Sequence, residues 1–300
     1  METIHATPSD SLQNILAAAK PGTKIFLAEG IYREKVQIST PDIELIGAGA
    51  DSTIIVYNDF AKKLDQHCVE YNTFRTWTMA VTAPHVRLKN ITVENDAHSP
   101  KTKGQEVALT VYANDFSAEH CRFLSTQDTV FLGPLPDDLI ERYNGFLKDE
   151  LRAEGAEKQY FANCLLAGTV DFIFGCGDAL FQNCEIRSLY EERGYGYVAA
   201  PAHALSQQIG FVFQDCRFTC DQNVPDESVF LARPWRDFGK ASFVNCIYGP
   251  HIAKTGFDKW NDTARDKTAR FSEFPKNEGR VSWSALLSEQ EKEKLIGYFR

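Results

Sequence analysis

Two aspartates occupy the same position in two copies of a repeated segment. Asp128 lies seven residues after Cys121, and Asp171 lies seven residues after Cys164. An apolar run follows each of them, Thr-Val-Phe-Leu in one copy and Phe-Ile-Phe-Gly in the other. If the copies stack, the two carboxyl groups lie side by side, and one must keep its proton to higher pH than the other. Such a pair can divide into an acid and a nucleophile or base.

Aspartates at strand ends also occur as ordinary turn residues that cap backbone amides. The matched offset and the matched apolar run favour the chemical interpretation for Asp128 and Asp171. Glu191 lies at the same offset from Cys184, but the segment LYEERGYG around it lacks the apolar run. We therefore leave Glu191 out of the candidate set.

A carboxylate nucleophile also needs a cation and amide donors for the oxyanion that forms during acyl transfer. The segment LARPW offers Arg233 to pair with a carboxylate, and Trp235, two residues on, to stack on a sugar ring. Gln105 and Gln127 are uncharged donors; on a regular strand Gln127 faces away from Asp128, so it reaches the site only through a bend or bulge. Exposed, solubilising glutamines are the ordinary alternative for both.

The repeated segments around the cysteines indicate which secondary-structure elements hold these residues. Five of the eight cysteines come directly after Asn, Asp or His between apolar residues, in AEHCRF, FANCLL, FQNCEI, FQDCRF and FVNCIY. Their separations vary from 20 to 43 residues, unlike the near-constant period of helical solenoids and propellers. Short alternating segments rich in Phe, Val and Ile are typical of strands. We expect an all-β, right-handed parallel β-helix in which equivalent side chains, the cysteines included, form ladders about 4.8 Å apart.

Helical signals are confined to the two ends of the chain. Ser9, Asp10 or Ser11 can cap a helix from Leu12 to Ala19, and Ser288 with Glu291 forms a capping box before a segment that reaches Leu295 and Ile296. We expect short capping helices there, covering strand edges. No linker or shift in composition interrupts the chain, so residues 1–300 are expected to form a single domain.

Composition excludes several kinds of partner. The net charge of −9 and pI of about 5.3 provide no field for nucleic acid or anionic lipid, so neither nucleic acid nor a membrane is expected as a partner. No apolar run approaches a membrane span, and no secretory signal is visible, which predicts a cytoplasmic protein, or a secreted one whose signal was removed.

The cysteines lack a CxxC pair and are interpreted as buried thiols; no metal or cofactor is expected.

The chain closely resembles the pectin methylesterases, the pectinesterase family of carbohydrate esterases. Five signatures of that family occur in the family's order. They are GIYRE at residues 30–34, GQEVAL with Gln105, Gln127-Asp128-Thr129, GTVDFIFG with Asp171, and LARPW with Arg233. The segments REKVQI and WSALLSEQE add to the likeness, which covers nearly the whole chain.

The resemblance implies a right-handed parallel β-helix and hydrolysis of galacturonate methyl esters in pectin or oligogalacturonides, with release of methanol. It implies Asp171 as nucleophile and Asp128 as general acid and then base. Gln105 and Gln127 are implied as oxyanion donors. Arg233 is implied to bind Asp171, and Trp235 and Phe174 to line the sugar subsites. It implies no metal or cofactor, and we expect a monomer.

Two segments depart from the family pattern. Residues 134–158 form a long acidic insertion, expected to overhang the cleft and to favour methylated or short substrates by repelling de-esterified chains. Trp77 stands where relatives usually have a small residue, which leaves the shape of a subsite open.

Two alternative functions remain: an esterase or thioesterase acting on a different acyl group, and a non-catalytic β-helix that binds pectin. The aromatic residues favour a carbohydrate, and the aspartate pair favours catalysis.

Overall fold

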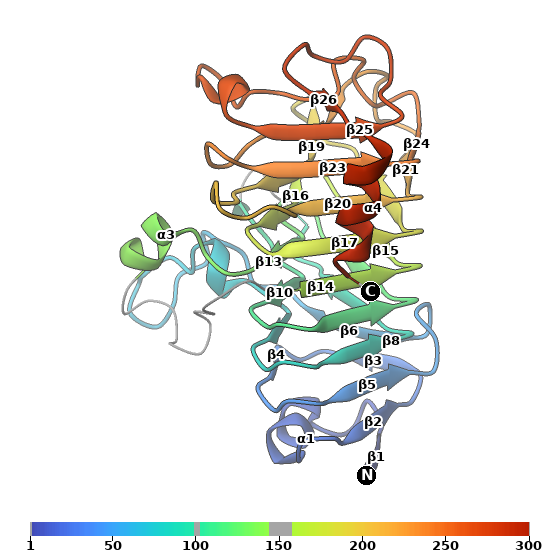
Figure 1. Ribbon diagram of the computed structural model, residues 1–300. Coiled ribbons are helices and arrows are strands. Elements are labelled where there is room, and N and C mark those ends of the chain that lie inside the picture. Colours follow the sequence, from blue (N-terminus) through green and yellow to red (C-terminus); the bar gives the residue numbers. More distant parts are fainter. Residues whose placement is uncertain (1, 99–102, 144–157, 300) are drawn as a thin grey trace.

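The chain winds into a right-handed parallel β-helix whose coils stack from the N-terminus to the C-terminus (Figure 1). The computed structural model describes residues 2–98, 103–143 and 158–299. In these residues the strands form three parallel sheets, which we call sheets A, B and C, of eleven, eight and seven strands. None of the described helices is long and apolar enough to cross a membrane. The fold predicted from the repeats is confirmed.

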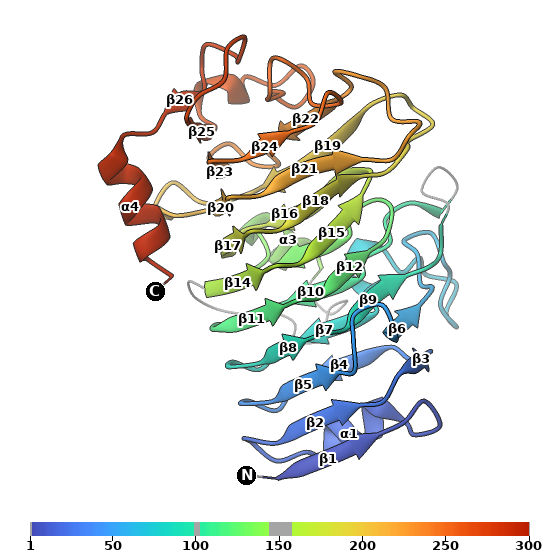
Figure 2. The ribbon, with the colours of Figure 1, turned by 90° about the vertical axis from the view of Figure 1, so that its right-hand side faces the viewer.

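Each coil contributes one strand to each sheet along most of the solenoid (Figure 2). Sheet A contains β1 (Thr3–Ala6), β2 (Lys24–Leu27), β5 (Glu44–Gly47), β8 (Arg87–Lys89), β11 (Phe116–Glu119), β14 (Lys158–Ala162), β17 (Asp178–Gln182), β20 (Phe211–Gln214), β23 (Lys240–Val244), β25 (Arg270–Phe274) and β26 (Ala285–Leu286). Sheet B contains β3 (Gly30–Tyr32), β6 (Thr53–Tyr57), β9 (Thr92–Asn95), β12 (Arg122–Leu124), β15 (Leu165–Gly168), β18 (Glu185–Ser188), β21 (Arg217–Cys220) and β24 (Ile247–Tyr248). Sheet C contains β4 (Val36–Ile38), β7 (Met79–Val81), β10 (Leu109–Val111), β13 (Val130–Leu132), β16 (Val170–Gly175), β19 (Gly196–Pro201) and β22 (Val229–Ala232).

The residue before each repeated cysteine makes the turn from sheet A to sheet B. It has a left-handed backbone, with φ between 52° and 54°, at His120, Asn163, Asn183, Asp215 and Asn245, and Asn90, which precedes Ile91 in an equivalent turn, has the same conformation. Asn and Asp tolerate this conformation better than other residues with a side chain, which explains their recurrence. The following residue points inward, as Cys121, Cys164, Cys184 and Cys216 do. All eight cysteines are free thiols, but only five are buried as expected, since Cys68 is exposed and Cys220 and Cys246 are partly buried.

Side chains that point inward form the predicted ladders. Phe161, Phe181, Phe213 and Phe243 pair in register along sheet A, with ring centroids 5.0, 4.7 and 4.8 Å apart. These spacings match the separation of about 4.8 Å between neighbouring strands. The ladders bury a continuous apolar core along the solenoid and keep successive coils in fixed register.

Two helices lie near the ends of the chain as expected. Helix α1 (Leu12–Ala18) begins at Ser11, whose hydroxyl accepts from the Asn14 backbone N–H, and it buries Leu12 and Leu16. Helix α4 (Glu289–Gly297) has the predicted capping box. However, α4 packs through Leu295 across the outer face of sheet A, beside β17, β20 and β23, rather than over a strand edge (Figure 1).

A third helix contradicts the prediction that helices are confined to the ends. Helix α3 (Asp137–Arg142) lies in the acidic insertion and projects from the side of the solenoid (Figure 1). Its two first-turn aspartates and last-turn arginine suit the helix dipole. Because α3 has only six residues, its apolar periodicity is too short to stand out in the sequence. Two single 3₁₀ turns, η1 (Thr73–Arg75) and η3 (Arg265–Lys267), also occur among the described residues.

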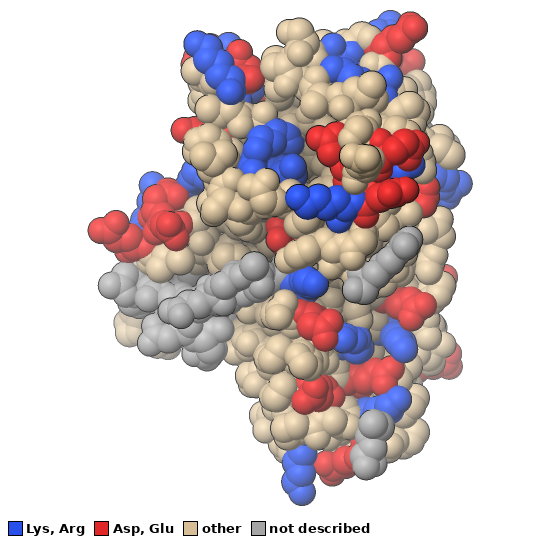
Figure 3. All heavy atoms as spheres, in the orientation of Figure 1, with Lys and Arg blue, Asp and Glu red and all other residues tan. Residues whose placement is uncertain are grey.

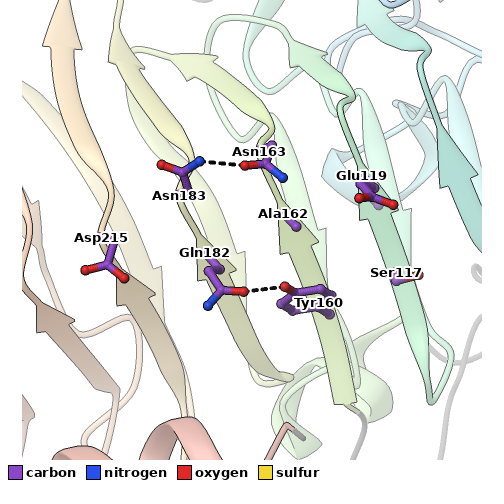
Figure 4. Close-up of a pocket in the computed structure, with 9 residues that line it drawn as sticks. Ser117, Glu119, Tyr160, Ala162, Asn163, Gln182, Asn183 and Asp215 are labelled. Atoms are coloured by element: carbon purple, nitrogen blue, oxygen red, sulfur yellow. Dashed lines mark hydrogen bonds between the residues drawn. The ribbon is translucent and has the colours of Figure 1, made fainter.

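The outer face of sheet A carries a stack of polar side chains around a pocket of about 400 Å³ (Figure 4). Asn183 donates from Nδ2 to Oδ1 of Asn163 at 2.5 Å. The Tyr160 hydroxyl donates to Oε1 of Gln182, whose Nε2 donates to Gln214 on the next coil at 3.3 Å. Gln182 and Gln214 each accept one hydrogen bond and donate another, Gln214 to Asp215 at 3.0 Å, whereas among the described residues Asn163 only accepts and Asn183 only donates.

Candidate active site

The two aspartates lie on neighbouring coils of sheet C. Val130 of β13 pairs with Ile173 of β16, so Asp128 and Asp171, each two residues earlier, occupy equivalent positions. The backbone N–H of Asp128 donates to the Val170 carbonyl at 3.1 Å. Since neighbouring parallel strands lie about 4.8 Å apart, the two carboxyl groups are stacked in adjacent coils. This is the arrangement that their common offset from the cysteines predicts.

Both aspartates have a left-handed backbone, with φ of 64° at Asp128 and 52° at Asp171. At Asp171 the register with β19 also shifts between Val170 and Ile173, which marks a bulge. The bend turns both carboxyl groups out of the core, while Phe172 stays buried inside it. Asp tolerates this conformation better than most residues with a side chain, as at the turns before the repeated cysteines.

The flanking signature residues hold this bend in place. The Thr129 hydroxyl is buried and donates to the Ala167 carbonyl at 2.9 Å, across to the coil of Asp171. Gly168 leaves room for the bulge, since a Cβ there would lie 2.3 Å from the Cβ of Phe172. The bend at Asp128 also brings Gln127 to the same side, as its predicted role requires.

Arg233 binds one aspartate of the pair through both of its carboxylate oxygens. Nε donates to Oδ1 of Asp171 at 2.8 Å and Nη2 donates to Oδ2 at 2.7 Å. The guanidinium lies between two aromatic rings, 3.8 Å from the centroid of Tyr197 and 4.0 Å from that of Trp260. A planar fork fixed on both faces has little freedom to leave the carboxylate.

These contacts affect the pKa of the two carboxyl groups differently. Burial raises the pKa of Asp128 well above its ordinary value, and the nearby charge of Asp171 raises it further. Burial also raises the pKa of Asp171, but hydrogen bonds and charge from Arg233 oppose that rise. Asp128 therefore keeps its proton to higher pH than Asp171 does. The unequal division expected from two stacked carboxyl groups arises from Arg233.

All seven residues predicted for the site line one cleft with a volume of about 430 Å³. They are Gln105, Gln127, Asp128, Asp171, Phe174, Arg233 and Trp235. Trp235 is partly exposed, whereas Phe174 is only 2% exposed and meets the edge of Trp235 with centroids 5.8 Å apart. Phe174 therefore supports Trp235 from below more than it offers a surface of its own.

Helix α3 contributes one wall of this cleft through Leu139 and Arg142, and Tyr143 follows directly. Asp138 binds Arg236 at 2.6 and 2.9 Å, and the Tyr143 hydroxyl donates to Asn72 Oδ1 at 2.9 Å. These contacts attach the described part of the insertion to the cleft, and its acidic side chains gather on the projecting side (Figure 3). Residues 144–157 of the insertion lie outside the described residues.

Sequence reasoning missed several residues of the site. Tyr197 and Trp260, which enclose Arg233, belong to no recurring phrase, and Trp260 comes from a loop after β24. Arg193 was also missed, although the offset of its partner Glu191 from Cys184 was a usable signal. Trp77 is 9% exposed, does not line the cleft, and packs behind it under Lys35. It therefore does not shape a subsite directly.

Comparisons with known proteins identify the family of the chain. The model of the Pectinesterase family matches residues 2–133 and 143–298, and the gap between these ranges includes all of α3. Pectinesterase 31 of Arabidopsis thaliana is 28% identical over 300 residues, covering 96% of this chain and 85% of that protein.

Two solved structures share the fold. Pectin methylesterase PemA from Erwinia chrysanthemi superposes with a TM-score of 0.80 at 22% identity, covering 99% of this chain and 96% of that one. A pectin methylesterase in complex with a hexasaccharide gives 0.78 at 21% identity, covering 96% and 93%. The match of the family model extends over almost the whole chain. The chain therefore belongs to the pectinesterase family of carboxylic ester hydrolases.

Proposed function

We propose that the chain hydrolyses methyl esters of galacturonate units in pectin or oligogalacturonides and releases methanol. The observation that carries this proposal is the stacked aspartate pair in which Arg233 binds Asp171 alone. The family membership and the likeness to a pectin methylesterase bound to a hexasaccharide support the substrate class. Trp235 supplies an aromatic face beside the pair for a sugar ring.

In the first step an oxygen of Asp171 attacks the ester carbonyl carbon, and the carbonyl electrons move onto its oxygen. Gln105 and Gln127 donate hydrogen bonds to that oxyanion. As the carbonyl re-forms, Asp128 gives its proton to the departing methoxide, which leaves as methanol. The galacturonyl group is then held on Asp171 as a mixed anhydride.

In the second step Asp128, now ionised, takes a proton from water. The resulting hydroxide attacks the galacturonyl carbonyl, which restores the Asp171 carboxylate and frees the galacturonic acid group, whose proton is then lost to water. Asp128 ends the cycle protonated, as it began. Its raised pKa suits the first role, and the contact of Arg233 with Asp171 suits a nucleophile that must be anionic.

Methanol release from methylated trigalacturonate and from esterified pectin tests the proposal. We expect release by the parent, near-complete loss in Asp171→Ala and a severe loss in Asp128→Ala. Substantial turnover in both variants would overturn the assigned roles. No methanol from either substrate, with hydrolysis of an unrelated acyl ester or thioester, would instead support the alternative of a different acyl substrate.

A further inference from the structure

An ion pair outside the residues assigned above contacts Gln127, which lines the cleft. Glu191 and Arg193 lie between β18 and β19, one coil beyond Asp171. Arg193 donates from Nε to Oε1 of Glu191 at 2.8 Å and from Nη2 to Oε2 at 3.1 Å. The Glu191 side chain is only 5% exposed and also accepts from the backbone N–H of Arg193 at 3.3 Å. Both oxygens of a buried carboxylate therefore fix the guanidinium.

The guanidinium of Arg193 also contacts Gln127, the residue directly before Asp128. Nη2 of Arg193 donates to Oε1 of Gln127 at 3.3 Å. A guanidinium carries donors and no acceptor, so the Gln127 atom that faces it must be the carbonyl oxygen. The NH₂ group of Gln127 then points the other way, where Gln127 is a hydrogen-bond partner of Asp128. Since a primary amide has two N–H groups, one remains for an oxyanion.

We propose that Arg193, held by Glu191, is a positioning residue that fixes the Gln127 amide with its NH₂ group toward Asp128 and the substrate. The inference rests on the proposed function, in which Gln127 stabilises the oxyanion and Asp128 is the acid. Without Arg193 the amide can turn over. Its carbonyl oxygen would then accept the proton of Asp128 and present lone pairs where the oxyanion forms.

Fixing the amide would therefore serve both parts of the first step. It keeps donors aimed at the site where negative charge develops, so that no reorganisation is needed during the reaction. It also leaves the Asp128 proton available for the departing methoxide. Because the contact acts on the transition state, its loss should lower kcat and leave KM nearly unchanged.

Kinetics of methanol release in two backgrounds test this inference. In Arg193→Ala we expect kcat to fall by about tenfold or more, with KM within about twofold. In the Gln127→Ala background the same substitution should cause no further loss, because the group through which Arg193 acts is already gone. Arg193→Lys keeps the charge but not the fork, and we expect it to recover only part of the activity.

Arg187→Ala is the matched control. Arg187 binds Glu185 two residues before it at 2.7 Å on β18, in the same i, i+2 arrangement and with a similarly exposed side chain, but its hydrogen bonds go to Glu185 and not to Gln127. We expect its kcat to equal that of the parent. An equal loss from Arg193→Ala in both backgrounds would show that Arg193 acts through its charge rather than through Gln127. That result, or no loss in the parent background, would overturn the inference.

A readout independent of activity separates this inference from the proposed function. The side-chain amide signals of Gln127 in a ¹⁵N–¹H NMR spectrum are assigned by their absence in Gln127→Ala. Arg193→Ala should shift them, and Arg187→Ala should not. A protein that releases no methanol but shows this shift would refute the proposed function and keep the positioning role. Unchanged signals in Arg193→Ala would refute the positioning role whatever the activity.

Discussion

Two regions of the solenoid stack polar side chains on neighbouring coils with opposite consequences. On sheet A, Asn163 and Asn183 form a pair in which one amide donates to the other, at an exposed surface (Figure 4). On sheet C, Asp128 and Asp171 occupy equivalent positions but offer only acceptors when ionised, and both are buried. The first pair satisfies itself, whereas the second requires a proton and a cation.

The comparison shows how one architecture yields both a structural and a reactive element. The spacing of the coils is the same in both regions, so the difference lies in the chemistry of the side chains and in their burial. Stacked amides stabilise the coils that carry them. Stacked buried carboxylates store unfavourable electrostatic energy, which Arg233 relieves chiefly at Asp171, the one to which it is hydrogen-bonded. Reactivity in this fold thus follows from placing two buried carboxyl groups at equivalent positions of neighbouring coils.

Making the reactive pair resemble the amide pair should have the largest effect. In Asp171→Asn, the new amide can donate to Asp128, so the pair no longer repels, but the nucleophile is lost. We expect kcat for methanol release to fall by about 10⁴-fold, with the fold unchanged by circular dichroism. Activity within tenfold of the parent would show that Asp171 is not the nucleophile.

Removing the cation should shift the pH dependence of the reaction. Arg233 lowers the pKa of Asp171 against the effect of burial, so Arg233→Met should raise that pKa. Asp171 would then ionise only at higher pH, and the acidic limb of the kcat/KM profile should move upward. Arg233→Lys, which keeps a charge without the fork, should move it less. An acidic limb that stays in place would show that Arg233 does not affect the ionisation of Asp171.

Replacing Asp128 should stabilise the fold relative to the parent, and by more at higher pH. Burial raises the folded-state pKa of Asp128 above its unfolded value of about 3.9. A raised pKa stabilises the fold fully below the unfolded pKa, and this contribution is lost as pH rises through the folded pKa. The Tm of Asp128→Asn relative to the parent should therefore increase between about pH 3 and pH 8. A constant difference in Tm would mean that Asp128 ionises normally in the folded protein.

Building a carboxylate pair on sheet A should have the smallest effect. The double variant Asn163→Asp/Asn183→Asp keeps residues that tolerate the left-handed backbone at both positions. Because the sites are exposed and screened, we expect a loss of only about 1 kcal/mol or less in unfolding free energy at neutral pH, reduced by salt. Methanol release should be unchanged. A loss as large as that expected for buried like charges would show that burial does not distinguish the two regions.

The fold and the centre of the site could be predicted because both depend on short-range sequence rules. The left-handed turn favours Asn or Asp before an inward cysteine, and a fixed number of residues then leads from Cys121 to Asp128 and from Cys164 to Asp171. Equal offsets in a solenoid give equal positions, so the pair could be found from spacing alone. The roles of the surrounding residues came from the family signatures.

The remaining features depend on contacts between loops of variable length. Trp260 reaches Arg233 from a loop that no repeat describes, and α3 reaches the cleft through Asp138 and Arg236. The position of α4 depends on apolar residues on the outer face of sheet A, which look like ordinary strand residues in the sequence. Glu191 was set aside because no apolar run follows it, yet it is buried against Arg193.

Titration of the two aspartate side chains tests the central claim most directly. Carboxyl carbon signals of Asp128 and Asp171 can be followed by ¹³C NMR and assigned with Asp128→Asn and Asp171→Asn. The account predicts that, as pH rises, Asp171 ionises first and Asp128 keeps its proton well above the ordinary range for aspartate. Ionisation of both groups together near the ordinary value, or of Asp128 before Asp171, would contradict it.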